Sequence, residues 1–110
     1  MPMIYSMEEI RSRVSAVAER HGLKAVYLFG SYARGTATAD SDIDLLIDIS
    51  GTKIKSLLQL SEVLCDFEDA FGKRVDLVTT RSLEQPIRMP SDVYFRENLR
   101  NERVEIYAVA

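Results

Sequence analysis

Apolar residues near the start of the chain recur with the period of an α-helix. Within residues 7–21 they fall on one face of such a helix. Ser6 precedes this run and Glu9 stands three positions later, which is the sequence pattern of a capping box. Gly22 follows the run and can take the left-handed conformation that ends many helices. We therefore predict a helix over residues 7–21.

The pattern then changes to one that is typical of strands. Residues 25–29 form a short run of apolar and aromatic side chains, as in a buried strand. Residues 42–49 alternate over most of their length between an apolar face and an acidic face. The apolar face carries Ile43, Leu45, Ile47 and Ile49, and the other face carries Asp42, Asp44, Leu46 and Asp48. Between the two strands, residues 31–34 are expected to form one helical turn and residues 35–41 a polar loop.

The second half of the chain contains another helical stretch and two further alternating stretches. Apolar residues between positions 54 and 71 fall near one helical stripe, which ends at Gly72. The predicted stripe contains Ile54, Leu57, Leu58, Leu64, Cys65 and Phe71. The remaining predicted elements are strands over residues 74–79 and 103–108, a connection over residues 81–90, and a helix from Ser91 or Asp92 to about Arg100.

This order of elements predicts an α/β fold in which helices pack on a sheet. The chain has 110 residues, a length that most often forms one domain, so we expect a single domain over residues 1–110. Hydrophobic residues make up 46% of the chain and charged residues 28%, which argues against a disordered protein. The formal net charge of −3 argues against nucleic-acid binding through a general basic field.

The sequence also bears on compartment and on cysteine chemistry. No apolar run approaches the ~20 residues of a membrane span. The first residues show no secretory signal, and we therefore expect a cytoplasmic protein. The single cysteine, Cys65, excludes an intramolecular disulfide and a cysteine-rich zinc site, and its place on the predicted stripe favours a position in the core.

Two aspartates on one predicted strand are the first candidates for chemistry. Asp42 and Asp44 stand at positions i and i+2, so their carboxylates share one face, ~6.6 Å apart along the backbone. Like charges this close on a half-buried sheet cost free energy unless cations compensate them. Magnesium prefers carboxylate oxygens and keeps positions open for phosphate oxygens. The pair is therefore predicted to hold one or two magnesium ions that clamp a triphosphate.

A glycine–serine turn precedes these acids and is a candidate for phosphate binding. Gly30 and Ser31 stand where a strand ends and a helical turn begins, and glycine permits close approach of a ligand to the backbone. The Ser31 hydroxyl can donate a hydrogen bond to a phosphate oxygen. Arg34, one turn further on, is a candidate for the same anion, with an ordinary surface charge as the alternative.

Asp76 is the third candidate acid. It faces away from Val75 and Leu77, as Asp44 faces away from its apolar neighbours. If the third strand pairs with the second, all three acids converge at one place. Asp76 is then placed to bind one metal ion and to accept the proton of an attacking hydroxyl.

These residues resemble the mark of the minimal nucleotidyltransferases of the DNA polymerase beta superfamily. That mark is Gly-Ser, a spacer, Asp-x-Asp and a later acid, here Gly30-Ser31, Asp42-Ile43-Asp44 and Asp76. The resemblance implies a palm-like fold with a small mixed sheet, in which Asp42, Asp44 and Asp76 are metal ligands and catalytic carboxylates. It also implies that Gly30 and Ser31 hold nucleotide phosphates. The implied reaction moves AMP from ATP to a hydroxyl with magnesium, as two ions, and releases pyrophosphate.

The string GSYARGTATADSDIDLLID resembles the members that are paired with HEPN-domain toxins. In those pairs the acceptor is a tyrosine of the toxin, a ribonuclease, and the nucleotidyltransferase is its antitoxin. The sequence shows no added helical domain to hold another substrate, which favours a protein partner. Two alternatives stay open: a non-catalytic antitoxin that neutralises by binding, and a nucleotidyltransferase that acts on a small molecule or RNA.

Overall fold

The computed structural model describes residues 4–80, 97 and 102–109, and its elements follow the predicted order. They are α1 (Met7–His21), β1 (Ala25–Phe29), α2 (Gly30–Arg34), β2 (Ile43–Asp48), α3 (Leu57–Phe71), β3 (Val75–Thr79) and β4 (Val104–Ala108). The bounds of α1 and β1 are as predicted, and the other strands agree with their predictions within one residue at each end. The predicted connection over residues 81–90 lies outside the described residues. So does the helix expected to end near Arg100, except for Glu97, which is helical.

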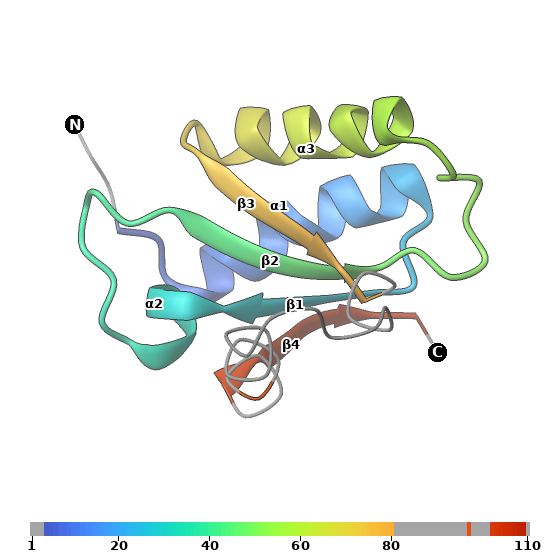
Figure 1. Cartoon of the computed structure of the whole chain (residues 1–110). Coiled ribbons are helices and arrows are strands. Elements are labelled where there is room, and N and C mark those ends of the chain that lie inside the picture. Colours follow the sequence, from blue (N-terminus) through green and yellow to red (C-terminus); the bar gives the residue numbers. More distant parts are fainter. Residues whose placement is uncertain (1–3, 81–96, 98–101, 110) are drawn as a thin grey trace.

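The four strands form one mixed sheet in the order β3-β2-β1-β4 (Figure 1). Strand β1 pairs antiparallel with both β2 and β4, whereas β2 and β3 are parallel and are joined by α3. Helices α1 and α3 pack against each other on one side of the sheet (Figure 1). The prediction of a small mixed sheet with helices packed on it is confirmed.

The core lies between this helical layer and the sheet. The apolar face of β2 enters it as predicted, with Ile43, Leu45 and Ile47 fully buried. Helix α1 begins and ends where its sequence predicts. The Ser6–Glu9 capping box forms at its start, and Gly22 caps its C-terminus in the left-handed conformation. None of the described helices is long and apolar enough to cross a membrane.

The predicted stripe on α3 is partly wrong. The buried residues of the helix are Val63, Phe67 and Phe71. Cys65, predicted to lie in the core, is exposed, because two residues from Phe67 is a rotation of roughly 200° around the helix. Leu57 and Leu58 are 82% and 74% exposed. They belong to the first turn of α3, which follows a capping box made by Ser56 and Gln59.

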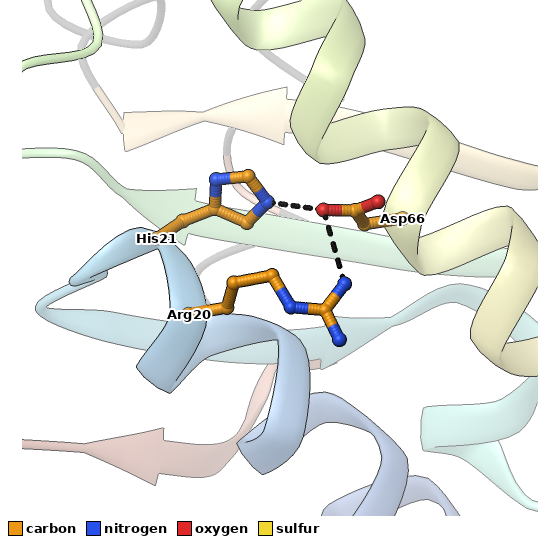
Figure 2. A network of polar contacts seen from close by, with 3 residues as sticks. All are labelled: Arg20, His21 and Asp66. Carbon is orange, nitrogen blue, oxygen red and sulfur yellow. Dashed lines mark hydrogen bonds and ion pairs between the residues drawn. The ribbon is translucent and has the colours of Figure 1, made fainter.

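A polar cluster ties the end of α1 to α3 (Figure 2). His21 Nε2 donates to Asp66 Oδ2 over 2.6 Å, and Arg20 Nη1 lies 3.4 Å from the same oxygen. The hydrogen bond from His21 is the main reason that the pKa of Asp66 lies below its ordinary value. His21 therefore links the end of α1 to α3.

Removal of the negative charge of Asp66 is expected to weaken the link between α1 and α3 at neutral pH. Because the folded-state pKa of Asp66 is lowered, its contribution is present above the unfolded pKa and is lost as pH falls through the folded value. Asp66→Asn should lower the free energy of unfolding by about 0.5–1 kcal/mol at pH 7, with the difference vanishing in acid. Urea unfolding at several pH values measures this, with the exposed Asp69→Asn as a control that should change little. An equal loss in both variants would contradict the assignment.

Candidate active site

The register of three strands brings the predicted glycine turn and the predicted acids to one end of the sheet. Because β1 and β2 are antiparallel, the last residue of β1, Phe29, lies opposite Asp44. Because β2 and β3 are parallel, their first residues meet, and Asp44 lies opposite Asp76. The condition set by the sequence, that the third strand pairs with the second, is therefore met. Asp42 stands just before β2 at the same end.

Gly30 lies directly against Asp44. Its φ of 74° lies in the left-handed region that disfavours other residues. A Cβ atom built at this position would lie 2.1 Å from Oδ2 of Asp44. The position therefore requires glycine for two independent reasons, one of them the carboxylate itself. This contact joins the glycine turn and the acids into one site.

The surroundings of Asp44 disfavour the ionised form of its carboxyl group. The pKa of Asp44 is raised from 3.8 to about 6, first by burial and then by a hydrogen bond with Asp76 and the charges of Asp76 and Asp42. The nearby charge of Arg34 acts in the opposite direction. Asp42 and Asp44 are half-buried and Asp76 is exposed. An added cation would relieve this repulsion.

A magnesium ion fits these residues by the chemistry of the donors. Three carboxylates on adjacent positions supply hard oxygen ligands, and their mutual repulsion favours a divalent cation. Within the described residues, no three His, Cys, Asp or Glu side chains are already gathered as a metal-binding group. Binding would therefore require the carboxylates to rotate toward a common point.

The structure also shows how the residues after Gly30 are held. Ser31 is the second residue of the short helix α2, which has no side-chain cap at its start. Arg34 Nη1 donates to Glu102 Oε2 over 3.0 Å, so this candidate lies near the acids but is paired with a residue before β4. The sequence alone does not reveal Glu102, because no local pattern links residues 68 positions apart.

A lysine that the sequence did not single out braces the loop between the glycine turn and the acids. Lys73 Nζ donates to the hydroxyl of Tyr32 and to the carbonyl oxygen of Ala39, each over 3.3 Å. It therefore ties α2 and the following loop to the residues that precede β3. In the sequence it is an ordinary lysine after a helix-ending glycine, and only the tertiary structure shows its contacts.

A small mixed sheet with helices on one side, with carboxylates beside a glycine turn, is the fold of a nucleotidyltransferase domain. The nucleotidyltransferase domain family matches residues 10–106, and the chain belongs to this family. The protein adenylyltransferase MntA of Thermococcus cleftensis is 42% identical over 86 residues, which cover 74% of this chain and 85% of that protein. A Methanocaldococcus jannaschii protein named as a candidate protein adenylyltransferase is 31% identical over 101 residues, which cover 92% and 98%.

Solved structures share the fold. A minimal nucleotidyltransferase structure superposes with a TM-score of 0.64 at 33% identity, covering 91% of this chain and 95% of that one. A chain of a toxin–antitoxin crystal structure with AMP-PNP gives 0.68 at 21% identity, covering 90% and 73%. A chain of the Shewanella oneidensis complex of tri-AMPylated HEPN toxin with MNT antitoxin gives 0.65 at 17% identity, covering 94% and 74%.

Two glycines allow the contact at Gly30 to be separated from its backbone strain. Gly35 has a φ of 76°, close to that of Gly30, but a Cβ there would meet nothing within 4 Å. Both Gly30→Ala and Gly35→Ala should lose about 1 kcal/mol of unfolding free energy from the left-handed backbone. Only Gly30→Ala should lose more and also lose the stabilisation by magnesium with an ATP analogue, as measured by thermal unfolding. Equal behaviour of the two variants would show that the Gly30–Asp44 contact is unimportant.

The raised pKa of Asp44 should make the free energy of unfolding depend on pH in the absence of divalent ions. Because the folded-state pKa of Asp44 is raised to about 6, its ionisation destabilises the folded state as pH rises from about 4 through 6. Asp44→Asn should therefore be more stable than wild type at pH 8, by about 1 kcal/mol after allowance for solvent exposure, and equal to it near pH 4. Denaturant unfolding in EDTA measures this difference. A variant less stable than wild type at pH 8 would contradict the repulsion.

Proposed function

We propose that this chain is a magnesium-dependent protein adenylyltransferase that transfers AMP from ATP to a tyrosine hydroxyl of a HEPN-domain ribonuclease toxin, and so acts as its antitoxin. The observation that carries the proposal is the alignment of Asp44 with Asp76 beside Gly30. This arrangement offers cation ligands and an acceptor for a proton in one place, beside a glycine turn.

Each residue has a role in this proposal. Asp42, Asp44 and Asp76 would hold magnesium as two ions, which when bound supply positive charge to the triphosphate. Gly30 and Ser31 would contact the phosphates through the close backbone and the hydroxyl. Arg34 would exchange its ion pair with Glu102 for a phosphate oxygen.

The transfer itself is a displacement at the α-phosphorus of ATP. The acceptor oxygen forms a bond to this phosphorus, and the bond from the phosphorus to the bridging oxygen breaks. Pyrophosphate leaves with the electron pair of the broken bond. Asp76, exposed at the start of β3, would accept the proton of the hydroxyl.

A protein acceptor is supported by the relatives more than by the site alone. The Thermococcus relative is named a protein adenylyltransferase, and structural neighbours come from complexes of MNT antitoxin with HEPN toxin. The net charge of −3 argues against a general nucleic-acid binder. We further propose a single domain over residues 1–110 and a cytoplasmic location, where ATP and a ribonuclease toxin would both be met.

Transfer of label from ATP to the partner tests the proposal. With magnesium, labelled ATP and the HEPN protein encoded beside this chain, wild type should label a tyrosine of that protein. Asp44→Asn and Asp76→Asn should each lower the rate by about 10²–10⁴-fold. Asp48→Asn is the matched control, since Asp48 lies on the same face of β2 but opposite Ala25, at the other end of the sheet.

The same assay separates the alternatives. Neutralisation of the toxin by an Asp42→Asn, Asp44→Asn double variant, as good as that of wild type and without label, would show a non-catalytic antitoxin. Label on RNA or on a small molecule, with none on protein, would show a transferase of another class. An unchanged rate of AMP transfer in Asp76→Asn would contradict the proposed role of Asp76 as the proton acceptor.

A further inference from the structure

Asp42 lies just before β2, so its position depends on the loop that leads to it as well as on the strand that follows. After Asp42, the amide of Ile43 donates to the carbonyl oxygen of Arg74 over 3.2 Å, which ties the start of β2 to the residue before β3. Before Asp42, a turn is closed by hydrogen bonds between Thr38 and Ser41. The chain is therefore held on both sides of this acid.

The turn before Asp42 is attached to the protein core through the side chain of Lys73. Its ammonium group donates to the carbonyl oxygen of Ala39, inside the turn, over 3.3 Å. The same group donates to the hydroxyl of Tyr32 over 3.3 Å and lies 5.5 Å from the centre of that ring. Tyr32 is only 7% exposed and packs with the core residues, so it is a firm anchor.

The contacts of Lys73 join the segments that carry the glycine turn and the acids. Tyr32 follows Ser31 in α2, the turn leads into Asp42, and Lys73 itself stands three residues before Asp76. Figure 1 shows α2, the start of β2 and the start of β3 at the same end of the sheet. Lysine suits such a junction, because one ammonium group can donate several hydrogen bonds at once.

We propose that Lys73 is a positioning residue for AMP transfer, which keeps Asp42 within reach of the metal ion that the other two acids would bind. This inference rests on the proposed function and adds a residue to its site. The acids must rotate toward a common point to bind the ion. A carboxylate on a loop that is already held needs only this rotation, whereas a loose loop must also be ordered, which costs conformational entropy.

Binding of manganese with AMP-PNP tests this role without the toxin, through the EPR signal of free manganese. Lys73→Met removes the ammonium group but keeps an unbranched side chain, and it should weaken manganese binding about tenfold. Lys73→Arg keeps the charge and N–H donors, and it should recover most of the affinity. Lys53→Met is the matched control, because Lys53 is exposed in the loop between β2 and α3, and it should bind manganese as wild type does.

Tyr32→Phe separates the hydrogen bond from the charge. This variant keeps the ring in the core and leaves every charge unchanged, but it removes one acceptor of Lys73. It should weaken manganese binding by less than Lys73→Met does. The double variant should be no weaker than Lys73→Met alone, because both substitutions break the same link. Losses that simply multiply would overturn the inference.

The transfer assay gives a second readout. Lys73→Met should need about tenfold more magnesium for its half-maximal rate, with the KM for the HEPN partner unchanged. Lower thermal stability with full manganese affinity would show a structural brace alone and overturn the inference. Equal losses of affinity in Lys73→Met and Lys53→Met, or no manganese binding by wild type, would overturn it too. If wild type binds manganese but labels no protein, the proposed function fails, and the manganese affinities still decide the role of Lys73.

Discussion

The parallel pairing of β2 with β3 is the constraint on which the rest of this site depends. It places Asp44 opposite Asp76, so two carboxylates face each other across adjacent strands, with Asp42 just before β2. Burial, followed by the hydrogen bond with Asp76 and the charges of Asp76 and Asp42, raises the pKa of Asp44 to about 6. The fold thus maintains an arrangement whose repulsion a divalent ion and its phosphate ligand would relieve.

The elements around the acids are built so that a ligand can approach them. Gly30 directly follows β1, and Asp44 occupies the space where a Cβ atom of this residue would be. Arg34 and Lys73 surround the same end of the sheet, one paired with Glu102 and the other bracing the loop before Asp42.

Local signals explain what could be predicted from the sequence. The capping box at Ser6 and the glycine at position 22 set the bounds of α1, since both act within one turn of the helix. The spacing of Gly30, Asp42 and Asp44 was enough to predict that these positions lie near one another, and the antiparallel pairing of β1 with β2 brings them to one end of the sheet. The position of Asp76 could be predicted only on the condition that its strand pairs with β2, because strand pairing depends on the tertiary structure.

The errors also have physical reasons. The apolar residues of α3 include both a core face and exposed positions such as Leu57 and Leu58, and a count of hydrophobic positions cannot separate them. Cys65 was therefore wrongly placed in the core. The pairs Arg34–Glu102 and His21–Asp66 join residues far apart in sequence, so no periodicity reveals them.

The most direct test of the central claim is to map where a divalent ion binds with an ATP analogue. Manganese can replace magnesium as a paramagnetic probe, and with AMP-PNP it should broaden the amide NMR signals of Gly30, Asp44 and Asp76. Signals of Asp48 and Thr79, at the other end of the sheet, should stay sharp. Broadening centred anywhere else, or none at saturating nucleotide, would contradict the account.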